Sequence, residues 1–347
     1  SNGIFTIEVT PVANPFITWE KAHKLNIGID FSMFGRRLSG TVDFYNNNFS
    51  DVLQTRGKSI ALLGASYPTE NIGKQRRSGI EIELGWQDHI GALNYYVNGN
   101  WTLEKTKMIY MDEQLTPFAY QRLTGRPLGV TLGLQCDGFL TAEDIRNGYP
   151  VMAGYEAQPG DVKYVDKNND NVIDEYDRTV IGGDKPLQYF GLDMGVEYMG
   201  IEFSMLWQGV YNRDIYVSDR TLVEGFQTYG QSYGQAYRNL LARWTPETAA
   251  TAKYPRLSAG GNTYNYGGMY GSSLWMHKGN FIRLKNITLA YNLPENWSNN
   301  ILGGLRVKVF VSAENALTFS SCDLVDPEVS FTSSPIQKCF FTGISLN

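Results

Sequence analysis

The sequence predicts an all-β fold, a portion of an antiparallel transmembrane β-barrel with long extracellular loops. Three observations support this prediction: polar and apolar residues alternate over long segments, short and long connectors follow one another, and aromatic residues gather near segment ends. The alternating segments exceed the ~5–6 residues of an average strand. They are long enough to cross a bilayer, which takes a tilted strand of about 9–11 residues.

The composition suits a strand-rich chain and excludes several classes of protein. The 347 residues are 42% hydrophobic and 19% charged, and 22 Tyr and 36 Gly favour strands and loops. No apolar run approaches the roughly 20 residues of a membrane-spanning helix. The net charge of -5 comes without a basic run, which argues against a nucleic-acid partner. The three cysteines show neither a disulfide framework nor metal-binding spacing.

The first predicted element is a strand hairpin over residues 24–45, with a turn at 34–37. Polar side chains fill alternate places in both halves, and the apolar places between them hold Leu25, Ile27, Ile29, Phe31, Leu38, Val42 and Phe44. Such alternation gives the hairpin one apolar and one polar face. On the barrel prediction the apolar face contacts lipid and the polar face contacts the lumen.

Alternation returns in later segments, which are the remaining strand candidates. They cover residues 80–86, 93–101, 189–210 and 305–315, and each is expected to be part of the same barrel wall. Trp86, Trp101, Tyr198 and Trp207 lie near strand ends, where a girdle at the membrane interface would place them.

The connectors divide into two kinds. Those at 87–92 and 199–200 are short enough for tight hairpins. The long ones run over about 54–77, 104–126, 138–186 and 212–274, and short turns on one side with long loops on the other are typical of outer-membrane barrels. Within the loops, 141–148 and 235–244 are expected to form short helices, the first with Thr141 as its N-cap.

The segment DKNNDNVIDEYD, residues 166–177, has the spacing of a Ca²⁺-binding loop. Oxygen ligands are expected from Asp166, Asn168, Asp170, Asp174, Asp177 and the carbonyl of Val172. Ile173 would anchor the loop, and Asn171 stands where the standard loop has Gly, a place that requires a left-handed backbone. The alternative is an acidic surface turn held by side-chain hydrogen bonds without metal.

A tyrosine-rich part of the last long loop is the candidate contact region for a substrate or a protein lid. Its rings can stack on sugars or pack at an interface, and the alternative is that they pack the loops against each other. The candidates are Tyr229, Tyr233, Tyr237, Tyr264, Tyr266 and Tyr270. No catalytic constellation accompanies them: GQSYG resembles a nucleophile elbow, but no apolar strand leads into it and no Asp separates Ser232 from His277.

Several longer motifs resemble the SusC/RagA-type TonB-dependent outer-membrane transporters. They are NPFITWEKAHKLNIGIDFSMFGRRLSGTVDFYNNNFSDVL, ENIGKQRRSGIEIELGW, PGDVKYVDKNNDNVIDEYDRTVIGGDKPLQYFGLDMGVEYMGIEFSMLWQGVYNRDIY, RWTPE, KYPRLS, FIRLKNITLAYNLP, VFVSAENALTF and DPEVS. The resemblance covers residues 1–347 and matches the C-terminal part of the family's barrel. It implies a roughly 22-strand barrel, of which this chain supplies about 10 or 11 strands, whereas the plug domain and the N-terminal barrel strands are absent.

The resemblance also implies function and partners. It predicts the wall of an importer of oligosaccharides or peptides, a SusD-like surface lipoprotein as lid, and TonB acting through the missing plug region. The remaining strands of the transporter and membrane lipid or lipopolysaccharide would surround this portion in the cell outer membrane. Loops 138–186 and 212–274 would be extracellular, with Ca²⁺ as a structural cation. The protein would not be an enzyme. The alternative from another class is a secreted, Ca²⁺-stabilised β-sandwich that binds glycans.

Overall fold

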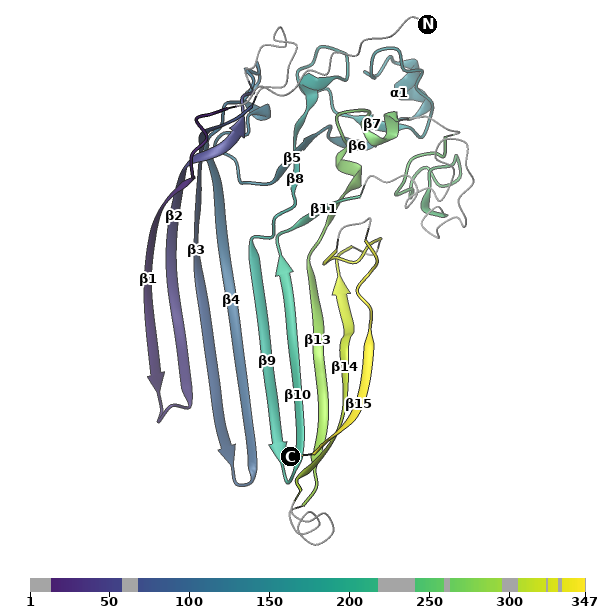
Figure 1. The fold of residues 1–347 in the computed structure, drawn as a ribbon. Coiled ribbons are helices and arrows are strands. Elements are labelled where there is room, and N and C mark those ends of the chain that lie inside the picture. Colours follow the sequence, from purple (N-terminus) through teal and green to yellow (C-terminus); the bar gives the residue numbers. More distant parts are fainter. Residues whose placement is uncertain are drawn as a thin grey trace, which may run out of the picture.

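The computed structural model describes residues 14–57, 68–217, 241–258, 263–294, 305–322, 324–329 and 333–346. Within these residues no helix has the length and apolar character needed to cross a membrane. Long antiparallel strands dominate the chain, and a smaller folded region stands at one end of them (Figure 1). The predicted all-β class is therefore confirmed.

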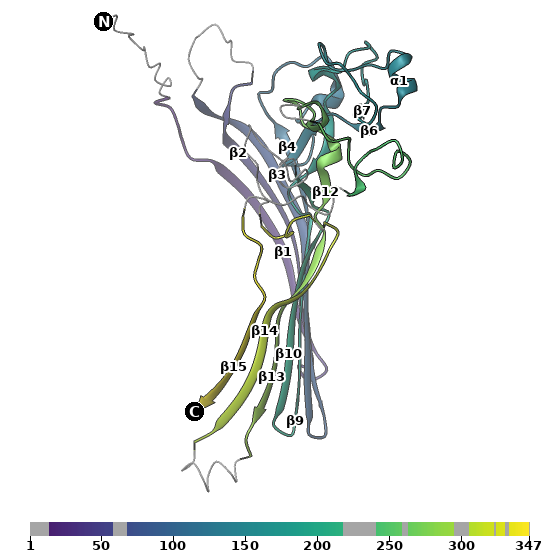
Figure 2. The same ribbon diagram turned by 90° about the vertical axis from the view of Figure 1, so that its right-hand side faces the viewer.

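Nine strands form one curved, open sheet in which every neighbouring pair is antiparallel (Figures 1 and 2). The strands follow chain order, as expected of an up-and-down barrel wall. Across the sheet they are β1 (Lys21–Met33), β2 (Leu38–Thr55), β3 (Thr69–Ile90), β4 (Leu93–Tyr110), β9 (Gln188–Tyr198), β10 (Ile201–Tyr211), β13 (Phe281–Asn292), β14 (Val307–Ser320) and β15 (Cys339–Leu346).

The strand count and the strand lengths differ from the sequence prediction. The described sheet has nine strands instead of 10 or 11, and β3 and β4 extend into residues 69–77 and 104–110, which were predicted as loops. In these extensions both faces carry polar side chains, so the alternation that marks a strand disappears from the sequence. Backbone pairing continues, as the register partners Arg76 and Lys107 show.

The register keeps one face of the sheet apolar from strand to strand. Ile29 pairs with Val42, Val42 with Ile82, and Ile82 with Trp101. These side chains are not covered by a second layer in the described residues, and Ile29 is 67% exposed. We call this face the apolar belt. An exposed apolar face of this extent fits a surface in contact with lipid rather than with water.

Tight turns close the sheet at one end, where the sequence predicted them. Gly35 and Gly200 have positive φ angles of 67° and 84°, and a Cβ atom at Gly200 would approach the Asn292 carbonyl oxygen to 2.8 Å. Trp86, whose ring nitrogen donates to the Tyr95 hydroxyl at 3.4 Å, marks this end of the apolar belt. The predicted aromatic position at this end is therefore occupied on the face that lipid would contact.

At the other end, the described residues 111–187, 212–217, 241–258 and 263–280 fold together beyond the long strands (Figure 1). We call their described parts the loop unit. Its secondary structure is three two-stranded sheets and several short helices: β5 (Val130–Gly133) with β8 (Thr179–Gly183), β6 (Cys136–Phe139) with β7 (Val162–Tyr164), β11 (Asp214–Tyr216) with β12 (Met276–Lys278), α1 (Ala142–Arg146), η2 (Ala119–Gln121), η3 (Glu175–Asp177), η5 (Tyr264–Tyr266) and η6 (Ser273–Trp275).

Both segments contribute to the core of the loop unit. Leu134, Val162, Tyr164, Ile173 and Tyr264 form one buried cluster, so side chains far apart in the sequence are packed together. The burial of Ile173 confirms its predicted anchoring role. A core of this kind is built for an aqueous environment, unlike the exposed face of the sheet below it.

The short helix α1 begins as predicted. The Thr141 hydroxyl accepts the backbone N–H of Asp144, and the Asp144 carboxylate accepts the N–H of Thr141, which completes a capping box. The second predicted helix, 235–244, falls largely outside the described residues, and residues 241–244 contain no α-helix.

Candidate functional site

The polar face of the sheet is its hollow side. A hollow of ≈ 490 Å³ lies against the strand middles, and a second of ≈ 900 Å³ lies nearer the tight turns. The first is lined mainly by polar and glycine residues from five strands, among them Asp30, Thr41, Glu83, Asn98, Asn100 and Asp193. This arrangement gives the sheet a polar concave face opposite the apolar belt, as in the wall of a barrel with a polar lumen.

Carboxylates are prominent on this concave face. The Thr41 hydroxyl donates to Asp30 at 2.7 Å, and the Tyr96 hydroxyl lies 3.4 Å from Asp193. Asp43 and Glu81 face each other in register, and the described part of the chain gives neither an ion-pair partner. The wall therefore offers hydrogen-bond acceptors to hydroxyl, amide and cationic groups.

A buried aspartate joins the two halves of the loop unit. Asp161 has no exposed surface and accepts hydrogen bonds from Arg256 Nε at 2.7 Å, the Tyr155 hydroxyl at 2.8 Å and the Gln158 N–H at 2.8 Å. Asn265 Nδ2 donates to the same carboxylate at 3.2 Å. Four donors compensate the desolvation of the charge, and they fix residues 155–161 against residues 256–265.

This aspartate hub was not recognised as a site from the sequence. Asp161 belongs to the motif PGDVKY and Arg256 to the motif KYPRLS, both of which carried the family resemblance. An isolated acidic and an isolated basic residue separated by 95 positions give no local signal of pairing. Their presence in two motifs of the same family was the available clue.

The tyrosine prediction is corrected for two of its residues. Tyr264 and Tyr266 are only 3% and 7% exposed, so neither presents its ring to a substrate or a lid. Tyr264 stacks on Tyr155 with ring centroids 3.9 Å apart, and Tyr266 stacks on Trp275 at 4.8 Å. Burial raises the pKa of the Tyr264 hydroxyl. The alternative, in which the rings pack the loops together, is the arrangement that these two residues adopt.

The remaining tyrosine candidates have different positions. Tyr270 is partly buried and packs against the core that contains Tyr264. Tyr229, Tyr233 and Tyr237 lie outside the described residues, so their predicted contacts stay predictions. Composition alone could not separate core rings from surface rings, because the stacking partner Tyr155 comes from a distant part of the chain.

The predicted Ca²⁺ loop adopts a compact turn in which its carboxylates accept backbone N–H groups. Asp166 accepts from Asp170 at 3.2 Å and from Asn171 at 2.8 Å. Asp177 accepts from Lys167 at 2.6 Å and from Asp174 at 2.9 Å. Asn171 has a φ of 65°, which confirms the left-handed backbone expected where the standard loop has Gly.

The loop has the donor types of a calcium site but not a converged set. In the described residues, no group of three or more His, Cys, Asp or Glu side chains could hold a metal ion. Asp177 is fully buried, and burial together with the charge of Asp166 raises the pKa of its carboxyl above the usual 3.8, against the lowering by backbone N–H donors. A nearby cation would relieve this strain on the charged form.

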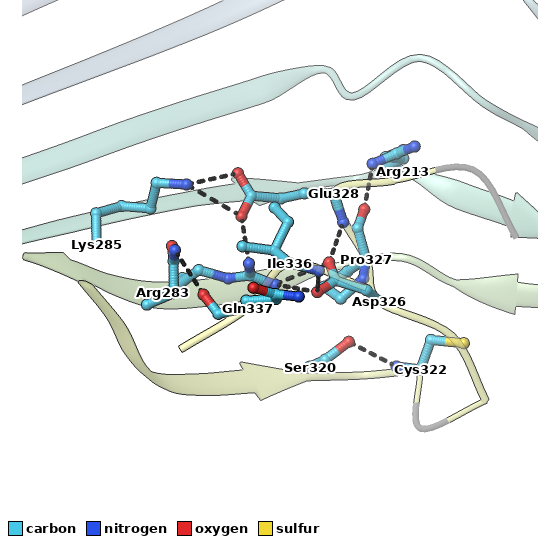
Figure 3. Close-up of polar contacts among 11 residues, drawn as sticks. Arg213, Arg283, Lys285, Ser320, Cys322, Asp326, Pro327, Glu328, Ile336 and Gln337 are labelled. Carbon is cyan, nitrogen blue, oxygen red and sulfur yellow. Dashed lines mark hydrogen bonds and ion pairs between the residues drawn. The ribbon is translucent and has the colours of Figure 1, made fainter. Parts of the chain in front are cut away.

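The connection between β14 and β15 is fixed to the concave face of the sheet by a buried arginine (Figure 3). Arg283, on β13, is 2% exposed; its Nη2 contacts the two carboxylate oxygens of Asp326 at 2.8 and 2.9 Å, and its Nη1 contacts Glu328 at 3.0 Å. Lys285 adds a contact to Glu328 at 3.3 Å, and Arg213 donates to the Pro327 carbonyl at 2.5 Å.

This ion-pair cluster shapes the rim of the concave face. The described residues between 322 and 338, together with the inner side of β13 and β14, enclose a hollow of ≈ 450 Å³. Burial alone would raise the pKa of Asp326, but the Glu328 N–H and the Arg283 guanidinium hold it below its usual 3.8. The connection therefore stays charged and attached at neutral pH. Asp326 and Glu328 belong to the motif DPEVS, which had no assigned role in the sequence analysis.

Comparison with known proteins decides the family. The family model for the TonB dependent receptor-like β-barrel matches residues 2–177, which is more than half of the chain. The chain belongs to this TonB-dependent receptor family. Proteins of the family are outer-membrane β-barrels, so the polar concave face is the inner face of a barrel wall and the apolar belt is the lipid-facing side. The family consists of receptors and transporters rather than enzymes.

Relatives of the TonB-dependent receptor family match along nearly the whole chain. TonB-dependent receptor P3 of Formosa agariphila is 24% identical over 345 residues, which cover 96% of this chain and 33% of that protein. TonB-dependent receptor SusC of Bacteroides thetaiotaomicron is 24% identical over 344 residues, 96% of this chain and 32% of that protein. The chain thus spans about a third of the length of the curated relatives it matches.

The fold is also similar to solved structures of the RagAB peptide transporter. One of them aligns with a TM-score of 0.73 and 19% identity and covers 98% of this chain and 36% of that chain. The structure of the RagAB peptide importer in its open-open state gives a TM-score of 0.74 at 20% identity, with 97% and 36% of the two chains covered. The nine-stranded sheet and the loop unit therefore share the fold of about a third of these longer chains.

Proposed function

We propose that this chain forms part of the wall of a TonB-dependent outer-membrane importer for oligosaccharides or peptides. The observation that carries the proposal is the two-sided sheet, which has a continuous exposed apolar face outside and a hollow, carboxylate- and amide-rich face inside. Such a wall separates lipid from a polar passage. Its acceptors suit solutes with many hydroxyl or amide donors, which both substrate classes provide.

The secreted β-sandwich alternative does not fit the arrangement. A sandwich buries the apolar faces of two sheets against each other. Here the nine long strands form one layer, and within the described residues nothing packs on the apolar belt. In water such a face would be an aggregation surface, whereas in a membrane it is the expected surface.

The remaining parts of the machinery would act through neighbouring regions. A SusD-like lipoprotein would cover the extracellular end, where the loop unit stands, as in the SusC/RagA-type transporters that the motifs resemble. A plug and the other barrel strands would lie in the two thirds of the relatives' length that this chain does not match. TonB would act on the plug, so this wall would take no part in energy transfer itself.

We also propose that the loop at 166–177 binds Ca²⁺ as a structural ion. The ligand spacing, the left-handed Asn171 and the raised pKa of the buried Asp177 carboxyl support the proposal. Binding would require side chains such as Asp166 to turn from their present N–H donors toward the ion.

The test of the calcium proposal is a thermal scan of the chelator-treated transporter with added Ca²⁺. A rise in unfolding temperature that disappears in Asp170→Asn is expected, whereas the exposed Asp137→Asn should leave it intact. No Ca²⁺-dependent rise in the wild type would leave the metal-free turn as the correct interpretation.

A membrane extraction tests the proposed function directly. Native outer membranes are solubilised in mild detergent, this chain is captured, and the masses of all retained polypeptides are measured. We expect one chain about three times as long, or a plug-bearing polypeptide, together with a lipoprotein. Binding of oligosaccharide and peptide libraries to the complex then identifies the substrate class. Recovery of this chain alone from the soluble fraction would refute the proposal.

A further inference from the structure

Four basic side chains lie on the outer face of β3 and β4 beyond the end of the apolar belt. On β3, Lys74 and Arg76 follow Ile80 toward the loop unit, and on β4, Lys105 and Lys107 follow Leu103. All four side chains are exposed. We call Lys74, Arg76, Lys105 and Lys107 the basic band.

The strand register places Arg76, Lys105 and Lys107 of the basic band on the lipid-facing side, and Lys74, beyond a register shift, pairs with Tyr110. Ile80 pairs with Leu103 in the belt, and two residues further along each strand Ser78 pairs with Lys105. The next outward pair is Arg76 with Lys107. Since side chains alternate between faces, these residues point outward with the belt, whereas the intervening Thr106 is buried.

The charges of the basic band are not compensated within the described chain. Like charges directly opposite each other in an antiparallel pair are destabilising, and Arg76 and Lys107 are such a pair. Arg76 Nε donates to Asn48 at 2.8 Å, but Asn48 is neutral. None of the four has a carboxylate partner in the described residues.

Nearby carboxylates are already engaged elsewhere. Glu70 pairs with Arg56 at 2.8 Å, and Asp51 pairs with Lys21 at 2.8 Å. Glu113 accepts the N–H groups of residues 123 and 124. The sheet thus retains a repulsive cationic cluster while its neighbours are neutralised, and an external anion is the group that would offset this repulsion.

The position of the basic band identifies the anion. Lys105 lies two residues, about 7 Å along the strand, beyond Leu103, where the regular apolar alternation of β4 ends. At the loop end of the barrel this is the level of the head groups of the outer leaflet. We propose that the basic band binds the phosphate groups of lipopolysaccharide in the outer leaflet, an inference that rests on the proposed membrane location.

The site is local rather than a property of the whole rim. At the corresponding end of β14, the outward positions hold Leu317 and Phe319, which are 47% and 59% exposed and apolar. A general attraction of the barrel to anionic head groups would not require the charges to gather on two adjacent strands. Because the band faces outward, it is also separate from the polar passage on the concave side.

The experiment compares lipopolysaccharide bound to the whole transporter and to a double variant, Lys105→Gln with Lys107→Gln. Both are purified from outer membranes in mild detergent, and bound lipid is counted by native mass spectrometry. Affinity is then measured in lipid nanodiscs containing intact or dephosphorylated lipopolysaccharide. A loss of about 30-fold in affinity is expected for the double variant, since each basic residue near a membrane surface contributes a factor of about five.

The matched control removes two charges elsewhere in the sheet, by Lys24→Gln and Arg36→Gln, which lie on the concave face and in a tight turn. This control should retain wild-type binding, and Lys105→Arg with Lys107→Arg should retain it too. Wild-type stoichiometry and affinity in the Gln variant, or equal binding of the dephosphorylated lipid, would overturn the proposal. So would inorganic phosphate alone binding to the wild type with the same affinity as the intact lipid.

Failure of this inference is distinguishable from failure of the proposed function. A transporter that fractionates with the outer membrane but binds lipopolysaccharide independently of the basic band refutes only the lipid site. A chain that does not fractionate with the outer membrane refutes the location on which both rest.

Discussion

The nine-stranded sheet and the loop unit place their apolar side chains in opposite environments. In the sheet, apolar residues such as Ile29 remain exposed, because the surrounding lipid takes the place of a protein core. In the loop unit, Leu134, Val162 and Tyr264 are buried in a common cluster. Stability of the sheet therefore depends on the membrane and on backbone pairing, whereas stability of the loop unit depends on packing and on a few buried polar contacts.

This difference separates the two regions experimentally. A substitution in the loop unit should alter loops while the barrel still inserts, and a substitution on the apolar belt should prevent insertion. Each of the following changes is intended for the whole transporter, so that the sheet has its neighbouring strands.

The largest effect is expected from Asp161→Ala. Removal of this fully buried carboxylate leaves Arg256 and Asn265 without their shared acceptor, which should destabilise the loop unit by about 3–5 kcal/mol. Hydrogen exchange of residues 130–183 and 263–280 measures the loss of protection. The variant barrel should still assemble, which is seen as the same electrophoretic mobility as the wild type in unheated samples.

The control for this change is Asp137→Ala, an exposed acidic position in the same unit. It should leave exchange unchanged. Loss of barrel assembly in Asp161→Ala would show that the sheet and the loop unit do not fold independently. It would contradict the separation of their stabilities described above.

A charge on the apolar belt should have the next largest effect. Leu84 lies in the middle of the apolar run of β3 and is 47% exposed in this structure. Leu84→Lys should cost about 2–4 kcal/mol, as for a cation at the bilayer midplane. Equilibrium unfolding in lipid vesicles measures this loss of unfolding free energy. Glu83→Lys, one residue away on the concave face, should cost little; an equal loss in both would contradict the assignment of faces.

A smaller effect is expected at the connection between β14 and β15. Asp326→Asn removes the charged partner from Arg283 Nη2 but leaves Glu328 in place, so a cost of about 1.5–3 kcal/mol is expected. Faster proteolysis within residues 322–338 would reveal the release. Lys338→Gln, in the same connection and exposed, should be cleaved at the wild-type rate. If both variants resist cleavage equally, the ion pairs do not hold this connection.

The smallest effect is expected from acidification, which should destabilise helix α1 through protonation of Asp144. The hydrogen bond from Lys163, opposed by burial and aided by the Thr141 donors, lowers the pKa of Asp144 from 3.8 to about 2. A lowered carboxyl pKa stabilises the folded form above 3.8, and this contribution is lost as pH falls toward about 2. Exchange at residues 141–148 should increase over that window, and Asp144→Asn should remove the pH dependence. A pH response that persists in the variant would assign it to another group.

The sheet was largely predictable from the sequence, because lipid on one side and water on the other impose a period of two on each crossing strand. The prediction failed at Lys74 and Lys107, where a strand continues with polar side chains on both faces. The loop unit was less predictable, since its contacts join distant segments. Ile173 could be placed in a core from loop chemistry alone, but the stacking of Tyr264 on Tyr155 had no local signature.

The buried contact between Asp161 and Arg256 has a consequence for the order of folding. Its two residues are separated by 95 positions, and closing so long a loop in a disordered chain carries a large entropic cost. Asp161 lies between β4 and β9, and Arg256 lies between β10 and β13. Pairing of these four strands brings the ends of the two connections close together, which shortens the effective loop between Asp161 and Arg256. We therefore expect this contact to form late, over a paired sheet. Protection of the Asp161 amide during assembly would then indicate that β4, β9, β10 and β13 have already paired.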